Sequence, residues 1–230
     1  MKLNSSQKSS WGHYASTMPC SESPSSAKCA IESLSLDRTN IFGVCIHHTC
    51  TETAEKAREV LKGKKQSTHF IIDKNGDTTV ELPLDKRAAA CVGFNKWTWQ
   101  VDVVGSLHIN EPTKEQILSL TNLLEILSCG RKIVTIDKKF GEKCRSLSKS
   151  EVAIETSNKY SETYKTYNIR AKKKGSWEKV LDSLPFTVFY HGEVRPTACC
   201  GKKLICKLPE IINNVASKRQ SKRQSETREV

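Results

Sequence analysis

The sequence predicts an α/β fold in which helices flank a central mixed β-sheet. Apolar, β-prone runs over 39–46, 101–107 and 185–190 are separated along the chain by amphipathic helical segments. This order is typical of a sheet with helices on its faces. An Asn75-Gly76 pair between two further β-rich runs indicates a tight hairpin. The sheet should therefore combine a hairpin with strands that are joined through helices.

The first half of the chain supplies most of these elements. Thr39–Ile46 is an apolar run of the kind found in buried central strands. Thr51–Leu61 combines good helix formers with apolar residues at helical spacing, and Gly63 is expected to end that helix. The two strands of the hairpin are predicted over Thr68–Asp73 and Thr78–Leu82.

A second helix is predicted to begin after Pro112. Thr113 and Gln116 stand at capping-box spacing, and a stripe of leucine and isoleucine follows on one helical face. This helix should end near Cys129-Gly130, and the chain then enters a lysine-rich segment. We expect the helix to pack its apolar face on the sheet.

The chain divides into three parts on composition. Residues 1–36 are rich in serine and are expected to form an irregular extension, and 37–215 should form the domain. Within the domain, 130–183 is an insertion whose tyrosines at i, i+4 and i+7 predict one amphipathic helix packed on the domain. A closing helix over 204–215 should be broken by Pro209. The repeated Lys-Arg-Gln-Ser tail in 216–230 is expected to be a disordered basic tail.

Charge and cysteine content restrict the class of protein. The chain has 37 Lys and Arg against 25 Asp and Glu, a formal net charge of +12, which predicts attraction to anionic partners. Its ten cysteines follow no disulfide-scaffold spacing, and the amino end lacks the apolar core of a secretory signal. No apolar run is long enough to span a bilayer. We therefore expect synthesis in the cytoplasm, and export would need another route. The sequence contains no signal of the oligomeric state.

Two histidines and one cysteine form the candidate metal site. His47 and His191 each follow an apolar strand, and Cys199 lies eight residues beyond His191 on a loop. Three protein ligands with a fourth position left for water are typical of a catalytic zinc site. His48 should point to the opposite face of its strand, where it would have a structural role or form a hydrogen bond to a metal ligand. Cys200 remains an alternative ligand, or a disulfide partner of Cys206 under oxidising conditions.

Five blocks in this order resemble the zinc-dependent N-acetylmuramoyl-L-alanine amidases, a family that includes phage-type endolysins, bacterial anhydromuropeptide amidases and peptidoglycan recognition proteins. The resemblance covers roughly residues 40–128 and 185–215. The blocks are Ile46-His-His-Thr49, Ser67–Gly76, Arg87–Gly93, Pro112–Gln116 and His191–Gly201, the last similar to the family's "GH-x-[DE]-x-x-P-T-x-C-P-G".

This resemblance implies an amidase-like or peptidoglycan-recognition-like fold. It also implies that His47, His191 and Cys199 hold Zn²⁺, and that the substrate is peptidoglycan or its muropeptide fragments. The bond cut would be the amide between N-acetylmuramic acid and L-alanine. Thr197 stands where the family has lysine or threonine near the developing oxyanion, so it is the candidate catalytic residue; a turn-stabilising role is its alternative.

Several positions depart from the family's pattern. Thr68 stands where a catalytic tyrosine is frequent, and Ala90 and Cys91 stand where the family's loop usually has a histidine. Leu107 stands near the position at which the cytosolic branch of the family has a catalytic glutamate. These departures favour a non-catalytic peptidoglycan-binding module as the alternative function. His69 should be a packed histidine, while Glu193 should be a structural acceptor or one that orients a ligand.

A nucleic-acid-binding protein is the third reading, and it is favoured only by the net charge and the Lys/Arg tail. The sequence contains no recognition-helix motif, and its aromatic residues do not alternate with basic ones as they do in single-strand binding platforms. The sequence thus argues against nucleic acid as the partner.

Overall fold

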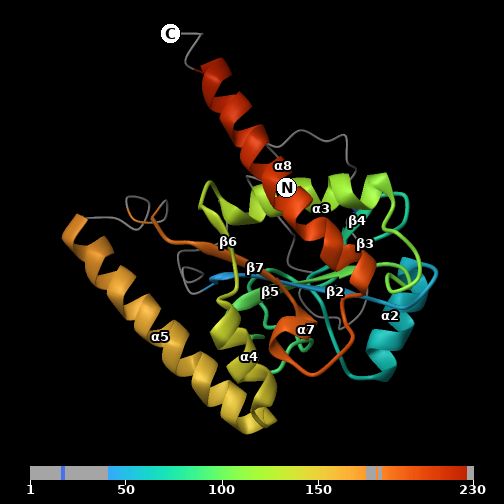
Figure 1. The fold of residues 1–230 in the computed structure, drawn as a ribbon, viewed down its shortest axis with the longest axis horizontal. Helices are drawn as coiled ribbons and strands as arrows, with labels where there is room; N and C mark the ends of the chain where they lie inside the picture. Colours follow the sequence, from blue (N-terminus) through green and yellow to red (C-terminus); the bar gives the residue numbers. More distant parts are fainter. Residues whose placement is uncertain (1–16, 19–40, 175–179, 181–182, 227–230) are drawn as a thin grey trace, which may run out of the picture.

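The structure is a computed structural model that describes residues 17–18, 41–174, 180 and 183–226. These residues form a seven-stranded mixed sheet with helices on both faces (Figure 1). In sheet order the strands are β1 (Thr17–Met18), β4 (Thr78–Val80), β3 (Phe70–Ile72), β5 (Thr98–Val103), β2 (Gly43–His48), β7 (Phe186–Tyr190) and β6 (Ile133–Thr135). The strands from β3 to β6 run parallel, and β4 and β1 add antiparallel pairs at one edge. The predicted mixed sheet is confirmed.

The helices form two outer layers. The described helices are α2 (Ala54–Gly63), α3 (Lys114–Ser128), α4 (Lys138–Ser146), α5 (Lys149–Lys174), α7 (His191–Val194) and α8 (Lys202–Glu226). Helices α3 and α8 lie side by side on one face of the sheet, and α2, α4 and α5 lie on the other (Figure 1). None of them is both long and apolar enough to cross a membrane.

The central strand β2 is buried along its whole length, as its apolar sequence predicts. Its side chains alternate between the two faces, so that Val44 and Ile46 join the core under α3 and α8 while Cys45 joins the core under α4 and α5. His47 follows Cys45 on the second face. Because β2 is parallel to β5 and β7, the carboxyl ends of all three strands meet at one edge of the sheet.

Local sequence signals account for the hairpin and for α3. Strands β3 and β4 pair antiparallel, and Gly76 in their turn has a φ of +88°, a conformation that favours glycine. At the start of α3, the Thr113 side chain accepts from the backbone N–H of Gln116, and the Gln116 side chain accepts from the N–H of Thr113. The predicted hairpin and capping box are both confirmed.

The prediction for the carboxyl-terminal part is wrong. Helix α8 continues without a break through Pro209 and the Lys-Arg-Gln-Ser repeat to Glu226, where a broken helix and a disordered tail from residue 216 were predicted (Figure 1). Its apolar stripe packs on both sides of Pro209, with Leu208 and Ile211 in the core shared with α3. Farther along, Arg219 donates to the backbone oxygen of Arg131 at 2.7 Å. These contacts stabilise as helix a basic segment whose composition predicts a solvent-exposed, disordered tail.

The insertion contains more structure than the one helix predicted for it. It supplies the edge strand β6, the short helix α4 and the long helix α5. Tyr160 of α5 is buried, and its ring stacks on Phe42 with the ring centroids 5.2 Å apart. The expectation that this tyrosine packs on the domain is confirmed. The extension 1–36 lies outside the described residues except for Thr17–Met18, which form β1.

Candidate metal centre

His47 is oriented by a hydrogen bond that its ring donates to the neighbouring strand β5. Its ring atom Nε2 lies 2.9 Å from Oε1 of Gln100. The amide nitrogen of Gln100 donates to the backbone oxygen of Thr98 at 3.2 Å and to its hydroxyl at 2.8 Å. Because these bonds fix the amide nitrogen on Thr98, the amide oxygen must accept from His47. Nε2 of His47 then carries the proton, and the lone pair of Nδ1 is available to a metal ion.

His191 and Cys199 are brought together by the closure of one loop. Strand β7 ends at Tyr190, and the short helix α7 begins with His191. The N–H of Gly192 donates to the backbone oxygen of Cys199 at 2.7 Å. A Cβ at Gly192 would lie only 2.6 Å from that oxygen, so the loop can close this tightly only with glycine. The spacing of eight residues therefore places the imidazole beside the thiol.

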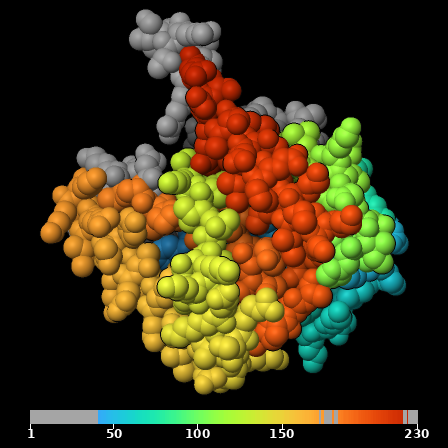
Figure 2. Space-filling model, in the orientation of Figure 1, coloured from blue at the N-terminus to red at the C-terminus, as the bar shows by residue number. Residues whose placement is uncertain are grey.

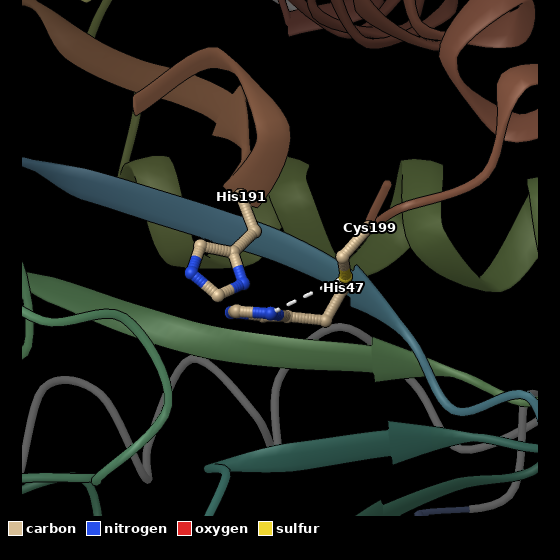
Figure 3. A group of neighbouring side chains, drawn as sticks. All are labelled: His47, His191 and Cys199. Carbon is tan, nitrogen blue, oxygen red and sulfur yellow. Dashed lines mark hydrogen bonds between the residues drawn. The ribbon is translucent and has the colours of Figure 1, made fainter. Parts of the chain in front are cut away.

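The three predicted ligands converge in space (Figure 3). One ligand atom from each of His47, His191 and Cys199 lies within 4.8 Å of the others. Sγ of Cys199 is 3.6 Å from Nδ1 of His47, and the two imidazole rings have centroids 4.8 Å apart. Zinc–sulfur and zinc–nitrogen bonds at a tetrahedral angle place sulfur and nitrogen about 3.6 Å apart. The donor set and its spacing fit a zinc ion.

The protonation states of the ligands suit metal binding. Burial, together with the nearby His47 and Arg195, lowers the pKa of His191 to about 3, so its imidazole is neutral at neutral pH. Burial raises the pKa of the Cys199 thiol to about 12, although the backbone N–H of His48 donates to its sulfur at 3.4 Å. The thiol therefore keeps its proton until a metal ion displaces it.

Asp102 is a residue of the site that the sequence analysis missed. It pairs with His47 across β2 and β5, and it is 5% exposed. Its Oδ2 has no hydrogen-bond partner among the described residues. Burial raises the pKa of this carboxyl group, and the charge of His47 opposes that rise. The signal in the sequence was a carboxylate inside the apolar run Val101–Val104.

Leu107 does not mark the position of an acidic helper. It is 2% exposed in the core, and its backbone N–H donates to Nδ1 of His48 at 3.2 Å. Strand β5 ends at Val103, and the chain then turns away from the sheet. The predicted strand, which continued to residue 107, is therefore too long at this end. Asp102, near the end of β5, is the acidic side chain that lies beside the candidate ligands.

Thr197 lies on the loop between the candidate ligands His191 and Cys199. It is exposed, and its hydroxyl oxygen accepts from the backbone N–H of Cys199 at 3.3 Å. This bond matches the turn-stabilising alternative. Glu193 accepts from the N–H of Tyr190 at 2.9 Å and so caps α7. At the tyrosine position of the family, the Thr68 hydroxyl donates to the backbone oxygen of Gln100 at 2.9 Å.

His69, His48 and Cys200 each have structural surroundings. His69 is buried, accepts from the N–H of Gln100 and lies 3.0 Å from the oxygen of Lys86, as expected of a packed histidine. His48 faces the core opposite His47, as strand alternation predicts. Cys200 is buried in the core under α8, and both it and Cys206 are free thiols.

Comparison with known proteins identifies the family. The family model Amidase_2, N-acetylmuramoyl-L-alanine amidase, matches residues 37–172. This stretch includes His47 and Asp102 and ends before His191 and Cys199. No curated protein matches the chain.

Three solved structures with low identity are similar to the chain. The endolysin N-acetylmuramoyl-L-alanine amidase LysCS from Clostridium intestinale is 19% identical, with a TM-score of 0.45 over 72% of this chain and 78% of that chain. Drosophila peptidoglycan recognition protein SA is 16% identical, with a TM-score of 0.41 over 74% and 79%. The Ph2119 endolysin from a Thermus scotoductus bacteriophage is 14% identical, with a TM-score of 0.40 over 71% and 79%. The family model covers more than half of the sequence, and the chain therefore belongs to the Amidase_2 family of N-acetylmuramoyl-L-alanine amidases.

Proposed function

We propose that this protein is a zinc-dependent amidase that hydrolyses the bond between N-acetylmuramic acid and L-alanine in peptidoglycan or its fragments. The observation that carries this proposal is the convergence of His47, His191 and Cys199 within 4.8 Å at the carboxyl edge of the sheet. Membership of the amidase family supplies the reaction class. Three ligands leave one tetrahedral position for water or substrate, as in catalytic zinc sites.

The chain's own residues supply binding, orientation and proton transfer. When bound, zinc lowers the pKa of a water toward ~7 and polarises a carbonyl group. Gln100 holds the His47 ring with Nδ1 toward the ligand cluster. Asp102 offers a buried carboxylate beside His47, and its raised pKa suits a group that accepts a proton during hydrolysis and then returns it to the leaving amine. We propose Asp102 as the acid–base group and keep Thr197 as the proposed hydrogen-bond donor to the developing oxyanion.

The overall charge supports an anionic substrate. A net charge of +12 attracts a glycan–peptide polymer that carries carboxylates, and salt should weaken that attraction. Cleavage of intact cell wall should therefore fall with ionic strength more than cleavage of a small uncharged muramyl-L-alanine amide. The difference between the two salt dependences distinguishes binding of the polymer from hydrolysis at the site.

A His47→Ala variant tests the proposal. The wild-type protein should release L-alanine-terminated peptides from purified peptidoglycan and hold one zinc ion per chain, and the variant should lose both. His108→Ala is the matched control, because His108 is exposed and lies beyond β5 with its ring against His48. Stoichiometric zinc and full cleavage in His47→Ala would contradict the assignment.

A non-catalytic peptidoglycan-binding module is the second candidate, and the state of Thr68 favours it. The hydroxyl of Thr68 is used by the backbone of Gln100, and the side chain is 1% exposed, so it cannot replace a tyrosine at the substrate. Under this reading the wild-type protein sediments with purified peptidoglycan but releases no peptides at any zinc concentration. Release of peptides in the same assay excludes it.

A further inference from the structure

We infer that the inserted helices α4 and α5 position the loop that carries His191 and Cys199, through reciprocal hydrogen bonds made by Arg145 and Arg195. This inference rests on the proposed function for its consequence, but the contacts themselves are independent of any metal ion. It assigns a role to the part of the insertion that forms α4 and α5.

The two arginines link the insertion to the loop, and each one donates to a backbone oxygen of the other segment. Arg145, at the end of α4, donates from Nη1 to the backbone oxygen of Gly192 at 2.9 Å. Arg195, just after α7, donates from Nη1 to the backbone oxygen of Leu147 at 3.1 Å. Each segment thus gives one guanidinium and one carbonyl group to the other. Figure 2 shows α4, in yellow, directly beside the orange segment that contains this loop.

Close backbone approach reinforces the contact. A Cβ at Gly141 of α4 would lie 2.9 Å from the backbone oxygen of Glu193, so glycine allows α4 to pack directly on α7. Val194 of α7 is fully buried in the same apolar cluster as Phe140 and Cys144 of α4. The arginine pair therefore sits at the rim of a packed interface and fixes its register.

The insertion is itself anchored to the domain away from the loop. The Thr156 hydroxyl of α5 donates to the backbone oxygen of Gly93 at 2.7 Å, and Tyr160 stacks on Phe42. Helix α5 thus rests on the segment before β2 and on the loop before β5. Because α5 is fixed to the rest of the domain in this way, the insertion can hold the loop in place.

The loop benefits from such support because its middle is exposed to solvent. Pro196, Thr197 and Ala198 are exposed between the two ligands, and α7 is a single turn. Toward β2, the loop is tied by the pairing of β7 with β2 and by the N–H of His48, which donates to Sγ of Cys199 at 3.4 Å. The arginine bonds hold the same loop from the side of the insertion, so their loss should raise the free-energy cost of assembling the three ligands. Removal of a group that orients metal ligands typically weakens metal affinity about 10–100-fold.

The test uses the double variant Arg145→Ala/Arg195→Ala in the full chain. We expect its zinc dissociation constant, measured by chelator competition, to rise about tenfold. In the cobalt-substituted protein the thiolate-to-metal absorption should weaken or shift. Arg145→Lys/Arg195→Lys, which keeps a donor at each position, should recover part of the affinity. Arg170→Ala on α5, where the guanidinium stacks on Tyr167, is the control and should match wild type.

Hydrogen exchange provides a readout that does not need zinc. In metal-free protein, the Gly192 amide should exchange faster in the double variant than in wild type, while core amides of β2 should be unchanged. Equal Gly192 exchange and a zinc dissociation constant within about twofold of wild type would overturn the inference. A wild-type protein that binds no zinc would instead overturn the proposed function, and the exchange result would still decide the positioning role.

Discussion

Nε2 of His47 lies 2.9 Å from the side-chain oxygen of Gln100, and this bond selects which ring nitrogen of His47 faces Cys199. Gln100 is fully buried and is held by two bonds to Thr98, so it cannot turn its amide around without losing both. The neighbouring strand β5 therefore sets the tautomer of a histidine on β2. The register between β5 and β2 therefore determines how the ring of a candidate metal ligand is oriented.

Gln100→Leu should weaken zinc binding. The substitution removes the acceptor for Nε2, so the His47 ring is free to rotate and to place its proton on either nitrogen. We expect a loss of about 10–100-fold in zinc affinity, with a matching loss of activity at limiting zinc. Chelator competition measures the affinity. Gln220→Leu, at an exposed position of α8, is the control, and equal affinities in the two variants would contradict the role of Gln100.

Asp102→Asn should separate metal binding from catalysis. The amide has the size of the carboxyl group but cannot accept the proton that hydrolysis of an amide must move. We expect the variant to keep one zinc per chain and to lose about 10²–10⁴-fold in kcat. Elemental analysis and muramyl-L-alanine cleavage check the two halves of the result. A variant with wild-type kcat would show that Asp102 only fills space beside His47.

The sequence predicted the parts of the site that reside in local patterns. The apolar strands ending near His47 and His191, and the spacing from His191 to Cys199, are visible in one dimension, and the structure brings these residues together. Gln100 and Asp102 were missed because their importance comes from strand register, which a single sequence does not display. A glutamine and an aspartate inside one apolar strand were the signals available, and burial next to His47 is what explains them.

The tail was mispredicted for a related reason. A Lys-Arg-Gln-Ser repeat has good helix formers but no apolar stripe, so its helicity depends on what lies before it. In the structure, Leu208 and Ile211 pack in the core before the repeat begins, and Arg219 then donates to the hydroxyl of Ser128, the last residue of α3. Long-range contacts of this kind are outside the reach of composition and periodicity.

Arg219→Ala should destabilise the fold if the last turns of α8 are docked as the structure shows. The side chain donates to the backbone oxygen of Arg131 and to the hydroxyl of Ser128. Because Arg219 is half-buried, we expect a loss of about 1 kcal/mol in the free energy of unfolding. Urea unfolding followed by circular dichroism measures it. Gln220→Ala is the exposed neighbour for comparison, and equal stabilities would indicate an undocked tail.

The buried thiol of Cys144 should make the free energy of unfolding fall as the pH becomes alkaline. Burial, with the nearby Glu155 and Cys91, raises the pKa of this thiol from 9.0 to about 11. Between these values the unfolded chain loses the proton while the folded protein keeps it, so the unfolded state binds fewer protons. The stabilisation is complete below the unfolded pKa and is lost as pH rises through the folded pKa.

The comparison is the slope of the free energy of unfolding against pH for wild type and Cys144→Ala. Between about pH 8 and pH 11, wild type should lose stability more steeply than the variant, because only wild type has this thiol to ionise on unfolding. Parallel curves would show that Cys144 is not kept protonated by the fold.

Zinc content tests the central claim most directly. Elemental analysis of the protein purified from zinc-supplemented medium should give one zinc per chain. Cys199→Ser should lose most of that zinc, and Cys206→Ser, which changes an exposed free thiol on α8, should keep it. A wild-type protein without zinc, or a Cys199→Ser protein that holds zinc as tightly as wild type, would contradict the assignment of His47, His191 and Cys199 as a metal centre.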